Sequence, residues 1–186
     1  MHRRLAELVE YTQGQRAELL KAVSAVPTTL RDIRADQAGW SVAEVLEHLH
    51  RVESGIVRLL RRGIQRARTA GAEVEDQQES LLGSLDAFAL SSRARPIRAP
   101  EPVMPRGELD AAHALLALES SRHDLLDAAR QGNGLALGAI TYPHPFFGML
   151  NLYQWILFVG QHEARHADQL RRIAARLAEQ PSRSGE

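Results

Sequence analysis

The strongest chemical signal in the chain is a pair of histidines in the segment His162-Glu163-Ala164-Arg165-His166. Two imidazoles spaced four residues apart on a helix lie on the same face and can bind one metal ion. The pair falls within an apolar pattern with steps of three and four residues. That pattern comprises Trp155, Val159, His162, His166, Leu170, Ile173 and Leu177. It predicts a helix with both histidines on its buried side.

Two histidines in an apolar face need polar partners, because a neutral imidazole donates one hydrogen bond and accepts another. A shared metal ion would meet this need, and so would neighbouring carboxylates or backbone carbonyls. Both explanations stay open for the pair alone. A catalytic site of the zinc type usually takes about three protein ligands and leaves the other positions open. A third ligand is therefore expected from another part of the chain.

The elements that must position these residues are predicted to be helices, with no convincing strand anywhere in the chain. The apolar periodicity predicts four helices, over residues 3–26, 42–68, 107–129 and 152–178. Two of them begin with a capping box, Ser41 with Glu44 and Asn151 with Gln154. The length of 186 residues fits one domain over residues 1–180, followed by a flexible tail at 181–186.

The segment 69–106 is predicted to be a long crossover between antiparallel helix pairs. It contains an acidic cluster at 73–79, an apolar patch at 81–90 that could form one short helix, and four prolines between 96 and 105. Connections longer than about 12–15 residues usually bind something or are disordered. A second proline-rich stretch at 142–145 is predicted to be a rigid loop before the last helix.

The third metal ligand is expected from the second helix, in the segment Glu47-His48-Leu49-His50. At about 100° per residue, His48 lies roughly 75° from the centre of the apolar face and His50 roughly 125° from it. His48 therefore flanks the core and His50 faces water. The predicted site joins His48 to His162 and His166 inside the bundle, where metal sites of helical bundles are usually built. The alternative is three histidines with separate partners.

Other polar residues could support this site. His144, in the proline-rich loop, could contact a substrate or could simply pack or cap there. Glu53 could accept a hydrogen bond from a ligand histidine or could be a solvated residue at the helix edge. The remaining histidines, His2, His113 and His123, have no partner that spacing identifies and are expected at the surface or half-buried.

The composition excludes several classes of function. The 23 basic and 23 acidic residues give zero net charge, so neither nucleic acid nor an anionic membrane is an expected partner. The absence of cysteine excludes disulfides and protein thiolates, and leaves histidine and carboxylate as metal ligands. The N-terminus lacks the apolar core of a signal peptide, and no apolar run approaches the roughly 20 residues of a membrane span. A cytoplasmic protein is expected.

Two segments carry a family resemblance, Trp40–Leu49 and His144–Trp155, the second leading to His162 and His166. They resemble the DinB-like superfamily of four-helix metal-binding proteins, which includes transferases that use bacillithiol or mycothiol. The resemblance covers most of the chain and implies an all-α, up-down-down-up four-helix bundle with a long middle crossover, often found as a homodimer. It also implies that His48 together with the histidine pair binds a divalent metal such as nickel, zinc or iron.

The leading functional hypothesis is a metal-dependent transferase that joins a low-molecular-weight thiol to a small electrophilic substrate. A hydrolase of a small molecule that uses metal-bound water is an alternative, and so is a non-enzymatic metal-binding stress-response protein. The segment also fits the H-E-x-x-H pattern of zinc proteases, with Glu163 as the general base. A peptidase is disfavoured, because Gln169 and Arg172 stand where a metzincin has glycine and histidine.

Overall fold

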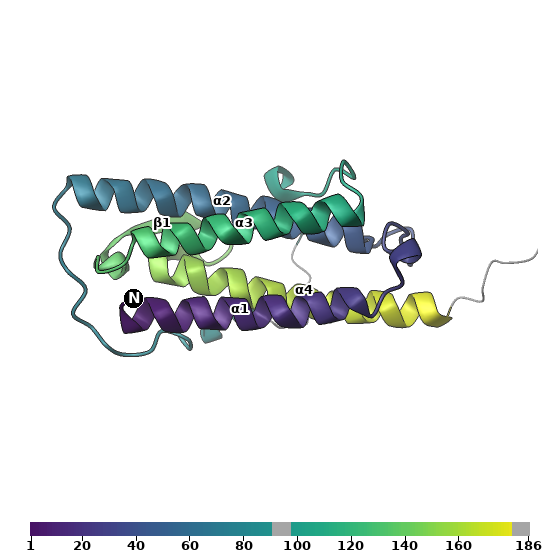
Figure 1. Cartoon of the computed structure of the whole chain (residues 1–186), viewed down its shortest axis with the longest axis horizontal. Coiled ribbons are helices and arrows are strands. Elements are labelled where there is room, and N and C mark those ends of the chain that lie inside the picture. The colour runs from purple at the N-terminus through teal and green to yellow at the C-terminus, as the bar shows by residue number, and fades with distance from the viewer. Residues whose placement is uncertain (91–97, 180–186) are drawn as a thin grey trace, which may run out of the picture.

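Four long helices form an antiparallel bundle. The computed structural model describes residues 1–90 and 98–179, and the helices are α1 (Arg3–Ser24), α2 (Val42–Thr69), α3 (Ala111–Gln131) and α4 (Leu152–Glu179). In Figure 1, α1 and α4 run in one direction and α2 and α3 in the other. The pairs α1 with α4 and α2 with α3 make the most extensive contacts, and α2 also packs on α4. The predicted all-α bundle with an up-down-down-up order is confirmed.

Both predicted capping boxes are present. The Glu44 amide donates to the Ser41 side chain at 3.2 Å, and the Ser41 amide donates to the Glu44 carboxylate at 2.8 Å. Asn151 and Gln154 make the same reciprocal pair at 2.9 and 3.0 Å. Each box satisfies two backbone N–H groups that a helix start leaves without partners. The two helices that carry the candidate ligands therefore begin where the sequence predicts.

The third helix begins four residues later than predicted. Its N-cap is Asp110, whose carboxylate accepts the His113 amide at 2.8 Å. An aspartate is a preferred N-cap because its side chain replaces the missing backbone acceptor. The residues from Gly107 to Asp110 therefore belong to the connection, and a positive φ of 69° at Gly107 fits that turn.

The core consists of two apolar clusters, one toward each end of the bundle. The first joins all four helices through residues such as Leu8, Leu60, Leu125 and Leu157. The second does the same through Leu19, Leu46, Leu118 and Leu170. All eight side chains are at most 1% exposed. Burying apolar surface on this scale is the main stabilising contribution in a bundle.

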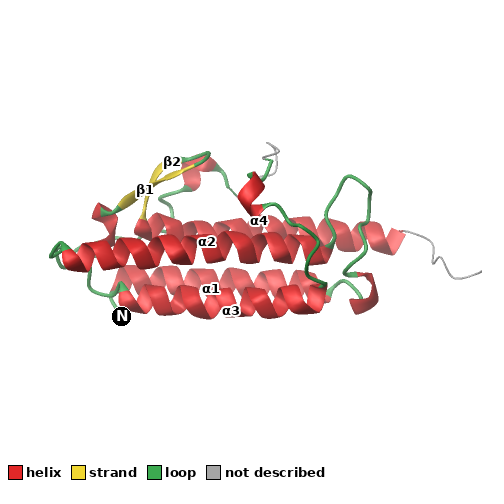
Figure 2. Ribbon diagram, turned by 90° about the horizontal axis from the view of Figure 1, so that it is seen from above, coloured by secondary structure: helices red, strands yellow, loops and turns green. Residues whose placement is uncertain are grey.

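A β-hairpin precedes α4, so the prediction that the chain contains no strand is wrong. Strand β1 (Thr141–His144) pairs antiparallel with β2 (Gly148–Asn151), and Thr141 lies opposite Asn151. Figure 2 shows the hairpin on the same side of the bundle as α2 and α4. The sequence hides it because each strand has only four residues and one of them is Pro143. Proline is tolerated in such short edge strands.

The crossover between α2 and α3 has little regular structure. The predicted short helix at 81–90 is a three-residue 3-10 turn, η2 (Asp86–Phe88), and a second one, η3 (Glu101–Val103), follows near the end of the crossover. Further 3-10 turns are η1 (Thr28–Leu30) and η4 (Leu137–Ala139). The start of the crossover is tied to α4, because the Tyr153 hydroxyl donates to Glu75 at 2.7 Å.

Part of the predicted connection and tail falls outside the described residues, namely 91–97 of the crossover and the tail at 181–186. Among the residues that are described, no helix has both the length and the apolar character needed to cross a membrane.

Candidate metal centre

The three histidines predicted as ligands lie together between α2 and α4. The Nε2 atom of His162 is 3.3 Å from Nε2 of His48 and 3.1 Å from Nε2 of His166. One nitrogen from each ring falls in a group whose members all lie within 4.8 Å of one another. Residues more than a hundred positions apart in the sequence therefore converge on one point.

The tautomers of two of these rings are set by their neighbours. Nδ1 of His48 lies 2.7 Å from the Val103 carbonyl oxygen, and Nδ1 of His166 lies 2.9 Å from the Gln169 side-chain oxygen. Both oxygens are acceptors only, so each Nδ1 carries the hydrogen and donates it. In a neutral ring the hydrogen is then absent from Nε2, which keeps a lone pair. Partners of this kind are typical of metal-binding histidines.

Burial favours the neutral form of these rings. Burial lowers the pKa of His48, although its hydrogen bond to Val103 opposes that effect. Burial lowers the pKa of His162 well below its usual value, and the neighbouring rings of His166 and His48 lower it further. A metal ion requires the neutral imidazole, so the surroundings prepare the ligands in the required protonation state.

The three Nε2 atoms fit a shared divalent cation. With bonds of about 2.0–2.1 Å, two nitrogens on a tetrahedral zinc ion lie about 3.3 Å apart. The observed separations of 3.3 and 3.1 Å match that spacing. Neutral rings alone fit less well, because His48 and His166 both direct lone pairs at His162, which has one hydrogen to donate. A cation would satisfy all three acceptors at once.

Two of the three rings are buried inside the bundle. His166 is 6% exposed and His48 is 4% exposed, so both occupy core positions on their helices. His48 was predicted to flank the core and is in fact fully inside it, because Trp40 covers that side. The Trp40 ring lies 5.0 Å from His48 and is stacked on His166 at 6.3 Å. His162 is half-buried, at the boundary with a cavity.

The end of the crossover is hydrogen-bonded to α2 next to the site. The two carboxylate oxygens of Glu47 accept the amides of Arg106 and Gly107 at 3.0 and 2.9 Å. One turn further along α2, Arg51 donates to the Pro102 carbonyl at 2.9 Å. Together with the bond from His48 to Val103, these contacts hold residues 102–107 against the ligand-bearing face of α2. This part of the crossover therefore has a defined role, as one wall of the site.

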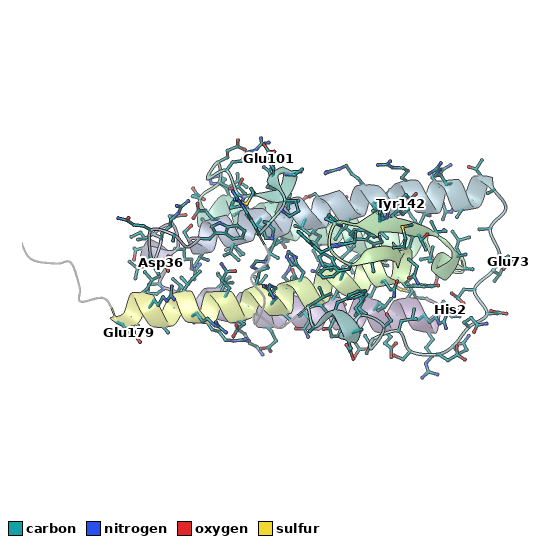
Figure 3. The ribbon with its side chains drawn as sticks, turned by 180° about the vertical axis from the view of Figure 1, so that it is seen from behind. His2, Asp36, Glu73, Glu101, Tyr142 and Glu179 are labelled. Atoms are coloured by element: carbon teal, nitrogen blue, oxygen red, sulfur yellow. The ribbon has the colours of Figure 1, made fainter. Side chains whose placement is uncertain are left out.

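A cavity of about 650 Å³ opens beside the three imidazoles. The η3 turn and the β-hairpin flank it, and Figure 3 shows both segments along the α2 and α4 side, at the labels Glu101 and Tyr142. Its walls are largely apolar, with Val52, Ile56 and Leu59 from α2 and Trp155 and Phe158 from α4. A cavity of this size and character is typical of small-molecule sites.

His144 lines the cavity but does not belong to the ligand group. Its ring is stacked on Phe147 at 4.5 Å and lies 4.8 Å from Phe158. Burial lowers the pKa of His144 to about 4, so the ring is neutral at pH 7. The sequence left open whether this residue meets a substrate or packs. The structure places it in a wall that a bound molecule would touch.

Glu53 does not orient a ligand histidine, so that expectation is not met. Its carboxylate accepts Arg16 at 3.0 Å, Arg122 at 2.7 Å and Ser121 at 2.7 Å. The reason is helical phase, since Glu53 follows His48 by five residues and therefore points about 140° away from it. Its partners lie on α1 and α3, on the side of α2 turned away from the histidines.

Glu163 belongs to the same polar group as Glu53. Its two oxygens accept Arg16 at 2.6 Å and Arg122 at 2.8 Å. The four side chains, Arg16, Glu53, Arg122 and Glu163, form a closed ring of ion pairs with one member from each long helix. We call this group the ionic ring. Glu163 lies on an adjacent face of α4, about 100° from His162 and about 60° from His166, and it does not line the cavity. Because both of its oxygens are held by the two arginines, Glu163 is not positioned as a peptidase base.

The remaining histidines lie apart from the centre, as predicted. His50 is half-buried rather than exposed, with Nδ1 3.5 Å from the Ser54 hydroxyl, and it is not in the ligand group. His113 pairs with Asp110, and His123 is exposed. His2 lies near the surface beside Gln78 at 3.1 Å.

Sequence reasoning did not identify Val103, Gln169 or the members of the ionic ring. Gln169 follows His166 by three residues on the same helical face, which is a usable signal for a side-chain contact. Val103 contributes only its backbone carbonyl, so its side chain carries no signal. Arg16 and Arg122 could have been noticed as charged residues at apolar phases of their helices.

The comparisons with known proteins agree with this architecture. The family model of the DinB superfamily matches residues 11–170, so the chain belongs to that superfamily. An uncharacterized protein of Bacillus subtilis, YuaE, is 26% identical over 145 residues, which is 74% of this chain and 79% of the relative.

Two solved structures share the fold. TT2238, described as a four-helix bundle protein, has a TM-score of 0.61 and 22% sequence identity over 90% of this chain and 98% of its own. An uncharacterised protein from Escherichia coli UTI89 has a TM-score of 0.57 and 14% identity over 97% of this chain and 98% of its own. Both likenesses show the bundle architecture.

Proposed function

We propose that this protein is a divalent-metal-dependent transferase that joins a low-molecular-weight thiol to a small electrophile. The observation that carries the proposal is the convergence of three Nε2 atoms at one end of an apolar cavity. Membership of the DinB superfamily supports it. A divalent cation held by His48, His162 and His166 would supply Lewis acidity, which lowers the pKa of a thiol and favours the nucleophilic thiolate.

The chain's own residues would orient the reactants and exclude water. Val103 and Gln169 hold two of the ligand rings in place through their Nδ1 hydrogens. The apolar walls contributed by Ile56, Leu59 and Phe158 surround the space next to the imidazoles. Because the chain has no cysteine, the sulfur nucleophile must come from a second bound molecule. The cavity is large enough for two small reactants.

In the overall reaction the S–H bond of the thiol is replaced by an S–C bond to the electrophile. The thiol proton passes to solvent, and the leaving group departs with the electron pair of its former bond. No oxidant or reductant is required. The protein contributes by holding the two reactants next to one another, which removes much of the entropic barrier.

A hydrolase that uses metal-bound water is the alternative, and the ion itself would lower the pKa of that water. A protein general base with a pKa near 7 would assist such a reaction. The described lining residues include no Asp or Glu. Glu163 is engaged in the ionic ring, and His144, with its pKa of about 4, is a weak base. The described cavity therefore offers no carboxylate base to either reaction, and the assay below separates the two.

The test measures turnover of the metal-loaded protein with a panel of thiols (bacillithiol, mycothiol, glutathione and cysteine) and 1-chloro-2,4-dinitrobenzene. Turnover with at least one thiol is expected, and His162→Ala should lower it at least 100-fold. The matched control is His50→Ala, which removes a histidine outside the ligand group and should keep the wild-type rate.

Three results would contradict the proposal. One is that none of the thiols reacts faster than in the absence of protein. Another is that His162→Ala turns over as fast as the wild type. The third is thiol-independent hydrolysis of 4-nitrophenyl acetate that requires the same histidines, which would identify the hydrolase instead.

A further inference from the structure

A row of aromatic rings leads from the β-hairpin to the candidate metal centre. Phe147 is stacked on His144 at 4.5 Å with an interplanar angle of 24°. His144 lies 4.8 Å from Phe158, and Phe158 is stacked on His162 at 5.2 Å with an angle of 14°. All four residues line the cavity. The cavity therefore has one wall of aromatic rings that ends at a candidate ligand. We call Phe147, His144 and Phe158 the aromatic wall.

A second part of the cavity lining is aliphatic and also suited to a flat apolar group. It is formed by Val52, Ile56 and Leu59, which occupy successive turns of α2. A planar ring held between aliphatic side chains and aromatic faces gains both apolar burial and offset stacking, worth about 0.5–1.5 kcal/mol for a stacked pair beyond the burial. The shape and chemistry of the cavity thus favour a planar aromatic ligand.

The fixed charges among the described lining residues have one sign. Apart from the imidazoles, the ionisable side chains there are Arg98 and Arg165, and neither Asp nor Glu occurs among them. His144 is neutral. Arg165 donates to the Leu90 carbonyl at 3.3 Å, which holds its guanidinium at the cavity edge. Positive groups at the edge of a low-dielectric cavity attract anions and repel cations.

We propose that the electrophilic substrate of this site is an aromatic molecule with an anionic group, its ring on the aromatic wall and its negative charge toward Arg98 and Arg165. This inference rests on the proposed function, since it names the substrate class of the same site. Neutral aromatic compounds would bind more weakly, and cationic ones of the same shape would bind weakest.

The two tryptophans of the chain provide the measurement. Trp40 and Trp155 are the chain's full complement, and both line the cavity. Intrinsic fluorescence therefore reports directly on what the cavity binds. Nitroaromatic compounds quench tryptophan, so 4-nitrobenzenesulfonate, 4-nitrobenzyl alcohol and 4-nitrobenzylammonium form an anionic, neutral and cationic series of similar size.

The experiment titrates the three probes into the full chain in a metal-loaded and a chelator-treated sample. An anion that bound only to the metal ion would lose its higher affinity over the other two probes after chelation. The expected dissociation constant of the sulfonate is at least ten-fold below that of the ammonium compound in both states. Arg98→Gln should reduce that ratio at least three-fold and leave the affinity for the alcohol unchanged. Arg61→Gln, which removes an exposed arginine paired with Asp124, is the control and should change nothing.

Phe147→Leu tests the aromatic wall, because it removes a ring but keeps an apolar side chain in a half-buried position. All three probes should bind at least three-fold more weakly to this variant. Equal affinity for the three probes, or an unchanged ratio in Arg98→Gln, would overturn the charge preference. Unchanged binding in Phe147→Leu would overturn the stacking site. These measurements need no turnover, so they can fail while the transferase assay succeeds, or the reverse.

Discussion

The three candidate ligands differ in how their unused nitrogens are held. His48 and His166 donate from Nδ1 to a backbone carbonyl and to a side-chain amide respectively. His162 instead stacks on Phe158. A ring fixed by a hydrogen bond loses less freedom when it binds a metal, so these partners should increase affinity without touching the ion. Val103 and Gln169 are therefore positioning residues.

Metal content provides the prediction at this scale. The wild-type protein should bind one divalent ion per chain, and His48→Ala should abolish stoichiometric binding because two histidines remain. Gln169→Ala should weaken the affinity about 10–100-fold, the usual effect of losing a partner of a ligand histidine. Elemental analysis and competition with a chelator measure both effects.

The control for this prediction is His50→Ala, which changes a histidine two positions from His48 but outside the group of converging nitrogens. It should retain one ion per chain. A stoichiometric ion in His48→Ala, or an equal loss in both variants, would mean that the ion binds elsewhere.

At the scale of elements, the site depends on how closely α4 approaches α1 and α2. Gly160 marks one such close approach. A Cβ atom at this position would lie 2.7 Å from Cε1 of Tyr11 and 2.8 Å from Cδ1 of the same ring. Gly160 is two residues before His162, so this contact helps to set the position of the ligand-bearing turn of α4 relative to α1.

Gly160→Ala is expected to destabilise the protein even though alanine favours helices. The overpacking against Tyr11 should cost about 1–3 kcal/mol, and the better helix propensity should return up to about 1 kcal/mol. The net effect is a lower midpoint in thermal or chemical unfolding. Circular dichroism against temperature or urea measures it.

The matched control is Gly14→Ala, because Gly14 lies within α1 and a Cβ there would meet nothing within 4 Å. This variant should be more stable than the wild type, by up to about 1 kcal/mol. The two substitutions should therefore shift the midpoint in opposite directions. A higher midpoint in both variants would show that the contact with Tyr11 has no energetic effect.

At the scale of the whole molecule, the ionic ring joins the four helices between the two apolar clusters. Burial lowers the pKa of Arg122, but Glu163 and Glu53 more than reverse this effect, so the pKa is raised and the guanidinium stays charged. Glu53 and Glu163 are each 2% exposed. Such a ring contributes little net stability compared with apolar residues, but losing one member leaves an unpaired buried charge.

Glu163→Gln should therefore destabilise the bundle by about 3–5 kcal/mol, because Arg16 and Arg122 would share one carboxylate. The control is Glu18→Gln, which breaks an exposed pair with Lys21 and should change the unfolding free energy by less than about 1 kcal/mol. Urea unfolding measures both. Similar small changes in the two variants would show that the ring does not hold the helices together.

The sequence indicated the candidate ligands and the helices because both have local signatures. The spacing of His162 and His166 places two rings on one helical face wherever that helix packs. The capping boxes at Ser41 and Asn151 depend on residues three positions apart, and both formed as predicted. The match of residues 11–170 to the DinB superfamily confirms the family that the motifs resemble.

Other features depend on contacts between residues distant in the sequence, and the tertiary structure alone decided them. The partner of His48 is the carbonyl of residue 103, a backbone atom that every amino acid carries. Glu53 and Glu163 lie within five residues of candidate ligands in the sequence, yet their helical phase turns them toward the ionic ring. The hairpin at 141–151 is too short for a periodic pattern. Periodicity fixes the face on which a side chain lies, whereas packing of the helices fixes what that face meets.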